Sequence, residues 1–307
     1  MTVEEKYRQG RPRVATIGFF DGVHRGHRFL IGQVIGLAHE RSMESLVVTF
    51  DRSPRQVLAD DFSPCLLTTA EEKRRLLLST GITACEMLHF TPEMASLSAR
   101  DFMRKLHDEM DVDVLLVGYD SRFGHGRTEG FADYVRYGEE LGMEVLRGKP
   151  YAEDGVTVSS SSIRTLLQEG RVAEAARCLS VPYTLEGHVV HGEHIGTGLG
   201  FPTVNLRVDS PVKLIPAHGV YAVTVSTNDR QQPLPAMLNI GHRPTFDGRK
   251  DTIEAHILDF EGDLYGKSLS VAFIDRLRDE RRFGTKEALV EQLGKDAAMV
   301  RQKLNFQ

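Results

Sequence analysis

The stretch that decides the fold of the amino-terminal half is Thr16-Ile17-Gly18-Phe19-Phe20-Asp21-Gly22-Val23-His24-Arg25-Gly26-His27. The apolar residues from Val14 to Phe20 predict a buried strand that ends at Asp21, and a periodic apolar pattern from Leu30 to Ala38 predicts a helix. Two histidines and two glycines therefore lie in a strand-to-helix turn. In an α/β sheet such a turn lies at the carboxyl end of a strand, where ligands bind.

The residue types in this turn suit a phosphate ligand. Unpaired N–H groups at the start of a helix attract anions, and glycines let a phosphate approach the backbone closely. Histidines add hydrogen-bond donors to a phosphate whose negative charge grows during transfer. The turn therefore predicts a phosphate site. The alternative is an ordinary turn with two surface histidines.

His24, Gly26 and His27 occupy the named positions of a His-x-Gly-His signature, so the segment resembles the nucleotidylyltransferases. The longer Gly-x-Phe-Asp-Gly-Val-His pattern most resembles the adenylyltransferase half of the bacterial FAD synthetases, the bifunctional riboflavin kinase/FMN adenylyltransferases. Phe19 departs from the family, which often has asparagine or another small residue there. The resemblance implies that His24 and His27 are catalytic. The residues it assigns to ATP phosphates are Gly18, Gly22 and Gly26.

The composition of the whole chain excludes several classes of protein. With 307 residues, 41% hydrophobic and 26% charged, the chain is long enough for two domains of ordinary soluble composition. Its net charge of −5 argues against a nonspecific nucleic-acid binder, and no apolar stretch approaches membrane-spanning length. The amino terminus has no signal-peptide pattern, and three scattered cysteines, Cys65, Cys85 and Cys178, predict reduced thiols in a cytoplasmic protein.

Strand-like and helix-like patterns alternate from Val14 to about Gly148. Further strands are predicted over residues 45–50, 111–118 and 143–146, and helices over 131–141 and from about 70 to Gly81. Thr68 and Thr69 precede Glu71 and Glu72 at the spacing of a capping box, which marks the start of the latter helix. This alternation predicts an α/β fold with a Rossmann-like, doubly wound parallel sheet.

A long polar loop with several glycines begins at Gly118, after the most apolar of these strands. A loop of this kind at the carboxyl end of a strand is where a nucleotide or flavin binds. It resembles the family motif Gly-x-Asp/Asn-Phe-x-Phe-Gly at Gly118, Asp120, Phe123 and Gly124, with Ser121 in place of the first phenylalanine. The resemblance implies that Asp120 contacts the nucleotide and that Phe123 forms part of the flavin site. The alternative is a solvated surface loop.

Several hydroxyl groups precede the next predicted helix, in Ser159-Ser160-Ser161-Ser162-Ile163-Arg164. One serine would suffice to cap a helix, whereas a cluster followed by Arg164 offers donors and a fork-shaped cation for a triphosphate. The segment resembles the family motif Ser-Ser-Thr-x-Ile-Arg. The resemblance implies that Ser160, Ser161 and Arg164 bind phosphate.

The alternation of strand-like and helix-like patterns ends before Pro182. Short β-type segments follow, separated by turn signals, and several alternate apolar and polar residues as a small barrel or sandwich would. They cover residues 183–190, 220–225, 236–240, 252–258 and 269–273. A last helix is predicted from Lys286 to about Leu304, with Thr285 as its cap. The apolar stripe expected to face the core is Leu289, Leu293, Ala297 and Val300.

Four glycines fall within the nine residues from 192 to 200. Such a segment permits a flap that closes over phosphates with its amide groups. Pro202 then fixes the chain so that Thr203 and Asn205 lie on one side of an extended segment, where a hydroxyl and an amide oxygen suit Mg²⁺. The alternative is a glycine-rich hairpin with a structural asparagine.

The same segment resembles the riboflavin kinase signature Gly-x-Pro-Thr-Ala-Asn, with Val204 in place of alanine. The resemblance implies that Thr203 and Asn205 hold the metal and the ATP phosphates. The flap residues it assigns to ATP phosphates are Gly192, Gly196, Gly198 and Gly200.

Thr252, Glu254 and His256 share one face of a predicted strand. A carboxylate on a rigid strand is a good general base for a primary hydroxyl. The segment resembles the Val-Glu-x-His segment of the kinase family, which implies that Glu254 is the base on the ribityl hydroxyl, and we expect His256 to be structural. Arg278 fits the family's Leu-Arg-x-Glu-x-x-Phe segment, and the resemblance gives it a contact with flavin or phosphate.

Taken together, the motifs imply a bifunctional FAD synthetase, with an FMN adenylyltransferase domain over 1–180 and a riboflavin kinase domain, an antiparallel β-barrel with a C-terminal helix, over 181–307. The predicted substrates are riboflavin, FMN and ATP, the last as co-substrate of both reactions, and Mg²⁺ is the predicted cofactor. No nucleic-acid or membrane partner is predicted, and the sequence leaves the oligomeric state open. The positions that depart from the family patterns include Phe19, Ser53, Ser121 and Thr197.

Two alternatives stay open. In one, the barrel binds flavin without phosphorylating it and senses the flavin level, an option that Thr197 and Val204 motivate. In the other, the amino-terminal domain adenylylates a different phosphorylated cofactor precursor.

Overall fold

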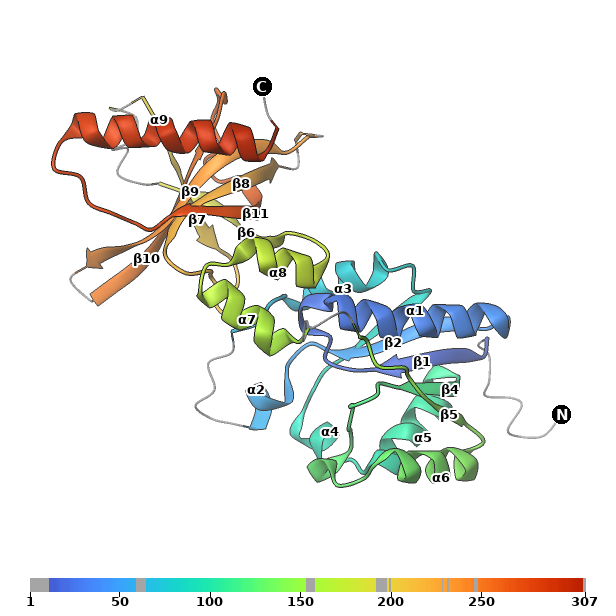
Figure 1. The fold of residues 1–307 in the computed structure, drawn as a ribbon. Helices are drawn as coiled ribbons and strands as arrows, with labels where there is room; N and C mark the ends of the chain where they lie inside the picture. Colours follow the sequence, from blue (N-terminus) through green and yellow to red (C-terminus); the bar gives the residue numbers. More distant parts are fainter. Residues whose placement is uncertain are drawn as a thin grey trace. The chain divides into compact units, whose positions relative to one another are not determined.

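The computed structural model describes residues 11–58, 65–152, 158–191, 198, 200–227, 229–230, 232–245 and 248–305. The chain divides into two units, Met1–Ser159 and Ser160–Gln307, and each is described by itself (Figure 1). In the part of the chain that the structure describes, no helix is both long and apolar enough to cross a membrane.

The first unit is built on a five-stranded sheet in which every neighbouring pair is parallel. Its strands, in the order in which they lie side by side, are β3 (Ala84–Leu88), β2 (Glu44–Phe50), β1 (Arg13–Ile17), β4 (Val112–Val117) and β5 (Glu144–Arg147). The chain therefore reverses its winding direction between β1 and β4. This order confirms the predicted doubly wound sheet and places its ligand-binding switch point at the carboxyl ends of β1 and β4.

The first strand ends three residues earlier than the sequence predicts. β1 stops at Ile17, although the apolar run continues to Phe20. Phe20 takes a left-handed conformation, with φ of 52°, so the backbone has already left the sheet while its side chain stays buried. The hydrophobicity of this residue therefore reports burial in the core and not membership of the strand.

Helices cover both faces of this sheet (Figure 1). On one face, α1 (Arg25–Glu40) and α3 (Ala70–Leu78) bury apolar side chains against β1, β2 and β4. On the other, α5 (Ala99–Met110) and α6 (Phe131–Leu141) pack against the opposite side chains of the same strands. Two short helices, α2 (Pro54–Leu58) and α4 (Pro92–Ser96), and two 3₁₀ turns, η2 (Asp21–Val23) and η3 (His125–Arg127), complete the described part of this unit.

Two predicted helix ends are confirmed by their caps. Thr69 and Glu72 form a reciprocal capping box at the start of α3, with both side-chain-to-backbone hydrogen bonds present. Gly142 ends α6 in the left-handed conformation, with φ of 74°, as glycine at this position commonly does. The ends of these helices are thus encoded by a few local residues.

The second unit contains a closed antiparallel barrel, which decides between the barrel and the sandwich left open by the sequence. Its strands, in spatial order, are β10 (Gly248–Ile257), β7 (Val204–Val208), β6 (Tyr183–Val190), β11 (Ser268–Arg278), β8 (Gly219–Thr227) and β9 (Leu234–Thr245). Helices α7 (Ser160–Gln168) and α8 (Val172–Leu179) precede the barrel, and α8 packs on β6 and β11. The predicted functional boundary after residue 180 stays a prediction.

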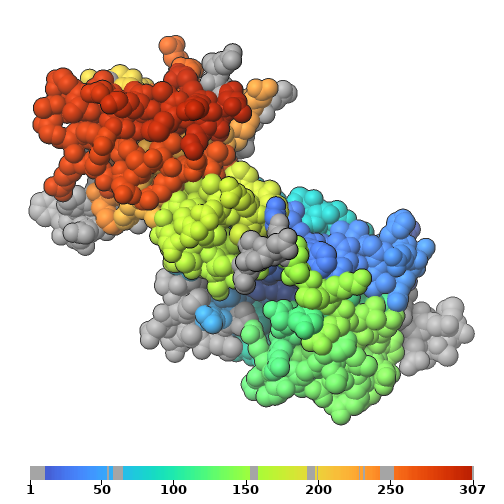
Figure 2. Space-filling model, in the orientation of Figure 1, coloured from blue at the N-terminus to red at the C-terminus, as the bar shows by residue number. Residues whose placement is uncertain are grey.

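The last helix, α9 (Lys286–Lys303), lies along one outer surface of the barrel unit, shown in red in Figure 2. The Thr285 hydroxyl accepts a hydrogen bond from the Ala288 amide at 3.2 Å, so the predicted cap is confirmed. Ala297 and Val300 are buried in a cluster with Met237 of β9, as the predicted apolar stripe requires. The neighbouring Asp296 is completely buried as well, which the stripe does not predict.

Candidate functional sites

The predicted phosphate turn follows β1 and has an unusual backbone. Phe20, Gly22 and Val23 all have positive φ, of 52°, 80° and 43°. Such conformations are uncommon outside glycine and concentrate at functional sites. The turn delivers His24 to the N-cap of α1, where its Nδ1 accepts a hydrogen bond from the His27 amide at 3.4 Å.

The two histidines form a stacked pair. Their ring centroids lie 3.5 Å apart, with an angle of 19° between the rings. Gly26 lies beneath this pair, since a Cβ on it would come within 3.3 Å of the His24 ring. The structure therefore brings together His24, Gly26 and His27, as the signature predicts.

A buried carboxylate holds this turn in place. The Asp21 side chain, 2% exposed, accepts hydrogen bonds from the Leu67 and Thr68 amides at 3.0 Å and from the Thr68 hydroxyl at 3.1 Å. The Thr68 hydroxyl in turn accepts from the Gly22 amide at 3.1 Å. The segment that leads into α3 is thereby tied to the turn that leads into α1.

Burial favours the neutral form of both histidines. Burial lowers the pKa of His24 to about 4, against the opposing attraction of Asp21. Burial, followed by the neighbouring His24 and Lys73, lowers the pKa of His27 well below its usual value. Among the described residues, the buried Nδ1 of His27 has no hydrogen-bond partner. A buried polar atom without a partner is costly, so this nitrogen is suited to a ligand oxygen.

A lysine that no sequence motif marks lies near this pair. Lys73 of α3 is 2% exposed, and its ammonium donates to the Phe50 carbonyl at 2.5 Å and lies 3.9 Å from the centroid of the Phe19 ring. Burial lowers the pKa of Lys73 to about 8, although Asp21 and other anionic groups oppose the shift. The signal available in the sequence is its position four residues before Leu77, on the apolar face of the helix.

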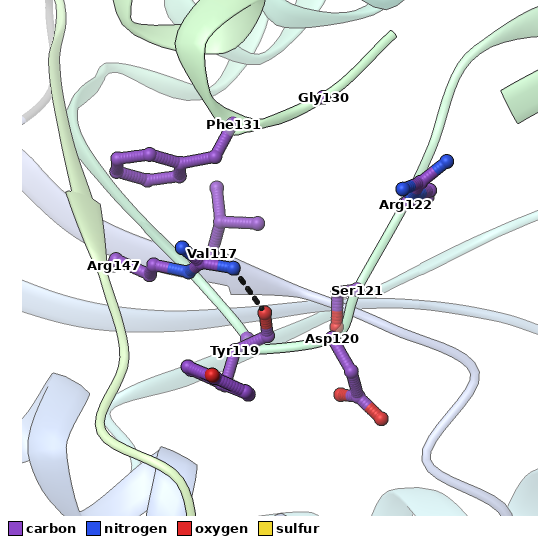
Figure 3. A pocket seen from close by; sticks show the side chains of 9 residues that line it. Val117, Tyr119, Asp120, Ser121, Arg122, Gly130, Phe131 and Arg147 are labelled. Carbon is purple, nitrogen blue, oxygen red and sulfur yellow. Dashed lines mark hydrogen bonds between the residues drawn. The ribbon is translucent and has the colours of Figure 1, made fainter. Parts of the chain in front are cut away.

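A second candidate site lies at the carboxyl ends of β4 and β5, where a cavity of about 310 Å³ opens (Figure 3). Its lining includes the predicted Asp120 together with the other residues from Val117 to Arg122. Arg147 lies over the rings of Tyr119 and Phe131, at 4.6 and 5.4 Å from their centroids, and donates to the Tyr119 carbonyl at 3.0 Å. Arg147, which the sequence analysis does not single out, gives the cavity a fixed positive charge.

The predicted flavin residue Phe123 is half-buried in the loop that begins at Gly118. Its ring stacks on Tyr134 with centroids 4.2 Å apart, and its amide donates to the Tyr134 hydroxyl at 3.1 Å. Tyr134 is completely buried and its hydroxyl also lies against the Glu129 carbonyl. The rigid support beneath Phe123 is thus a buried tyrosine, whose role only the tertiary structure reveals.

The predicted serine cluster opens α7 in the second unit. Ser160 is the first residue of this helix, and Arg164 follows four residues later, so both occupy the same face. Ser161 is exposed between them. The assignment of Ser160, Ser161 and Arg164 to phosphate stays a prediction.

In the barrel, strand register places two predicted site residues and a third polar residue in one row across the strands. Asn205 of β7 pairs with Glu254 of β10, and Glu254 pairs on its other side with Asn239 of β9. Residues directly opposite on antiparallel strands have Cβ atoms roughly 5 Å apart and share a face. The flanking Ile253 and Ala255 are buried within the barrel, so Glu254 and its row lie on the outer face.

The segment before Asn205 is also held in place. His256 of β10 hydrogen-bonds the Pro202 carbonyl through Nδ1 at 2.8 Å, and its ring meets that of Phe201 at 5.2 Å. Thr203 follows directly, so this contact is consistent with the structural role expected of His256, which stays a prediction. Of the predicted flap, Gly198 and Gly200 are described, whereas Gly192, Gly196 and Thr197 lie outside the described residues.

The same row continues around the barrel to Arg278, through Val220 of β8, which pairs with both Asn239 and Arg278. The Arg278 guanidinium is bound by the completely buried Asp296 of α9, with Nη2–Oδ2 at 2.7 Å and Nε–Oδ2 at 3.0 Å. Arg278 thus joins β11 to α9, and its contact with flavin or phosphate stays a prediction.

Within the described ranges, no group of three or more histidine, cysteine, aspartate or glutamate side chains is arranged to hold a metal. Of the two residues expected to hold Mg²⁺, Thr203 lies directly before β7 and Asn205 lies within it, so both offer a side-chain oxygen near the start of this strand. Hard oxygen ligands of this kind suit Mg²⁺, which keeps most of its coordination for water and phosphate.

Comparison with known proteins shows two families that match successive parts of the chain. Residues 6–162 match the FAD synthetase family, and residues 179–304 match the riboflavin kinase family. The bifunctional riboflavin kinase/FMN adenylyltransferase of Escherichia coli K12 is 36% identical over 290 residues, 94% of this chain and 92% of the relative. The chain belongs to the family of bifunctional riboflavin kinase/FMN adenylyltransferases.

One further relative and one solved structure are also similar to this chain over nearly its whole length. The bifunctional riboflavin kinase/FMN adenylyltransferase of Pseudomonas fluorescens is 37% identical over 94% of this chain and 92% of its own length. A crystal structure from Streptococcus pneumoniae, titled a macrolide-efflux protein, superposes with a TM-score of 0.88 at 30% identity, covering 97% of this chain and 96% of that one. The family resemblance predicted from the motifs is therefore confirmed over nearly the whole chain.

Proposed function

We propose that this protein makes FAD in two steps, each with ATP as co-substrate. The barrel unit phosphorylates riboflavin to FMN, and the amino-terminal domain transfers the adenylyl group of ATP to FMN and releases pyrophosphate. The observation that carries the proposal is the presence of both family domains, in this order, on one chain.

In the kinase reaction, Glu254 takes the proton from the 5′-hydroxyl of riboflavin. The hydroxyl oxygen attacks the γ-phosphorus of ATP, and the bond from that phosphorus to ADP breaks. Glu254 suits this role because it sits on the outer face of a barrel strand between two asparagines, Asn205 and Asn239. A base on a rigid strand keeps its geometry through the reaction. The rest of the catalysis is positioning and neutralisation of charge.

Mg²⁺ is the proposed cofactor of this step, held by the Thr203 hydroxyl and the Asn205 amide oxygen. When bound, the ion neutralises charge on the ATP phosphates. The carbonyl of Pro202 is bound by His256, which fixes the chain immediately before Thr203. Gly192, Gly196, Gly198 and Gly200 are proposed to contact the phosphates with their amides.

In the adenylyl transfer, a phosphate oxygen of FMN attacks the α-phosphorus of ATP, and the bond from that phosphorus to pyrophosphate breaks. The attacking phosphate is already ionised, so no general base is needed. Neutral His24 and His27 are proposed to donate hydrogen bonds to phosphate oxygens, and the unpartnered Nδ1 of His27 supports this role. Gly18, Gly22 and Gly26 are proposed to bind phosphate with them.

The remaining assignments are proposals from the motifs. Asp120 contacts the nucleotide, consistent with its place in the lining of the cavity at β4 and β5. Phe123 forms part of the flavin site, and Ser160, Ser161 and Arg164 bind phosphate. A cytoplasmic location is proposed from the small, odd number of scattered cysteines in the sequence, Cys65, Cys85 and Cys178.

The test is chromatography of riboflavin, FMN and FAD after incubation of the purified protein with riboflavin, ATP and Mg²⁺. FMN followed by FAD is expected. Glu254→Gln should lower the rate of FMN formation by roughly 10²-fold or more, because the general base is lost. Added FMN should still be converted to FAD. His27→Ala should show the reverse pattern. Loss of both activities in a folded single variant would contradict two separate sites, and binding of riboflavin without turnover would favour a flavin sensor.

A further inference from the structure

Lys73 of α3 is a deeply buried cation near the phosphate turn. We propose that Lys73 is a positioning residue of FMN adenylylation: its buried ammonium supplies a fixed positive charge beneath the turn and acts through His27, without touching substrate. The inference rests on the proposed function of the amino-terminal domain. It concerns a residue that carries no part of the His-x-Gly-His signature.

The first reason is that burial of this ammonium needs an explanation. At 2% exposure, Lys73 is held by one carbonyl, that of Phe50 at 2.5 Å, and by the face of the Phe19 ring at 3.9 Å. A charge removed from water is costly, and an apolar side chain of similar volume is often the more stable choice at such a place. A buried charge retained without a directly bonded carboxylate in the described structure points to a functional demand.

The second reason is the connection between α3 and the histidine turn. The amides of Leu67 and Thr68, directly before this helix, bind the Asp21 carboxylate in the turn. The helix that carries Lys73 is therefore anchored to the segment that carries His24. A charge on this helix keeps a fixed position relative to the histidines, as a positioning role requires.

The third reason is electrostatic. The ionisable groups that act on Lys73 come from each neighbouring element: Asp21 of η2, Asp51 after β2 and Cys85 of β3 all raise its pKa against the effect of burial. Lys73 in turn contributes to the lowered pKa of His27. Phe19 shields the ammonium from water, so its field reaches His27 with less screening than a surface charge would have.

The chemical consequence follows from the reaction. Negative charge builds on the oxygens around the α-phosphorus as the new bond forms, and a fixed cation nearby stabilises that charge without reorganising. The same cation disfavours a second charge on His27, which keeps the imidazole neutral and able to donate from one nitrogen only. Loss of Lys73 should therefore lower kcat for FMN adenylylation and raise the pKa of His27.

The experiment compares Lys73→Met, which removes the charge, with Lys73→Arg, which keeps it. Arg74→Met serves as matched control, because Arg74 is the adjacent exposed cation on the same helix. For each full-length variant, kcat and KM for conversion of FMN to FAD are measured from pH 6 to 9, and imidazole titration is followed by NMR. Folding is checked by circular dichroism and by riboflavin phosphorylation.

For Lys73→Met we expect a fall in kcat of at least tenfold with a smaller change in KM, and an upward shift of the His27 titration. Arg74→Met should match the wild type. In the wild type, kcat/KM should decline above about pH 8, where Lys73 loses its proton, and Lys73→Arg should extend the plateau, since arginine stays charged.

Two results would overturn the proposal: a Lys73→Met variant with wild-type kcat and unchanged His27 titration, or the same alkaline decline in the wild type and Lys73→Arg. Should Lys73→Met fail to fold, the comparison of wild type with Lys73→Arg still decides. Failure of the proposed function is distinct, because the wild type would then form no FAD while the His27 titration still reports the coupling to Lys73.

Discussion

The ion pair between Arg278 and Asp296 is expected to hold α9 on the barrel, and Arg278→Met tests this. Asp296 is completely buried, and among the described residues its carboxylate accepts four hydrogen bonds, three of them from the Arg278 guanidinium at 2.7 to 3.1 Å. In the variant, the carboxylate keeps a hydrogen bond from Gln292 at 2.7 Å but loses its countercharge.

 Removing one partner of a buried pair costs about 3–5 kcal/mol, because the other charge stays buried without compensation.

The assay is hydrogen–deuterium exchange of peptides that cover α9 in the full-length protein. At 1.4 kcal/mol for each factor of ten, the loss predicts roughly 10²- to 10³-fold faster exchange in these peptides, or more. Arg301→Met is the matched control on the same helix, since its ion pair with Asp259 is exposed and worth about 1 kcal/mol or less. Exchange of α9 within threefold of the wild type in Arg278→Met would refute the reasoning.

Arg278→Met and Asp296→Asn together test the ligand contact predicted for Arg278. Asp296→Asn loosens the pair but keeps the guanidinium, whereas Arg278→Met removes it. If the two variants show the same exchange rate in α9 and lose the same share of riboflavin phosphorylation, the role of Arg278 is purely structural. A larger loss in Arg278→Met indicates that the guanidinium also contacts substrate.

Two further outcomes follow from the site geometry. The free energy of unfolding should fall as the pH drops from about 6.5 to 4, because His24 takes up a proton in the unfolded chain while its folded pKa of about 4 keeps it neutral. The share of His24 is about 3 kcal/mol at most, and His27, whose pKa burial also lowers, adds to the fall. Urea unfolding across this range should therefore show a weaker pH dependence in His24→Asn than in the wild type, and an equal dependence would contradict the reasoning. His256→Phe, which loses the hydrogen bond to the Pro202 carbonyl, should lower riboflavin phosphorylation several-fold and leave adenylylation of added FMN unchanged. Wild-type phosphorylation in that variant would show that the bond does not position Thr203.

Local patterns predict most of the secondary structure. The strand over 183–190 and the helix that starts after Thr285 have the bounds or caps expected from alternation and capping residues. Prediction fails where a strand changes its regularity. β11 continues past Phe273 to Arg278 through two register shifts, which break the alternation that marks a strand in the sequence. β7 is predicted only as an extended segment, because it is five residues long and follows Pro202.

The candidate sites divide in a similar way. His24, His27, Asn205 and Glu254 are recognisable because each lies in a short motif whose spacing is set along the chain. Lys73 and Arg147 are not recognisable in this way, since single cations in a helix and at a strand end are common. Their significance depends on burial and on contacts with residues distant in the sequence.

The sequence by itself determined the family, the order of the two catalytic domains and the residues of the main motifs, because these depend on short-range spacing and residue type. Only the tertiary structure decided that the β segments close into a barrel, that register aligns Asn205, Glu254 and Asn239, and that Lys73 loses its water beneath the histidine turn. Strand register and desolvation arise from contacts between distant segments, and both set the charge and geometry of a site.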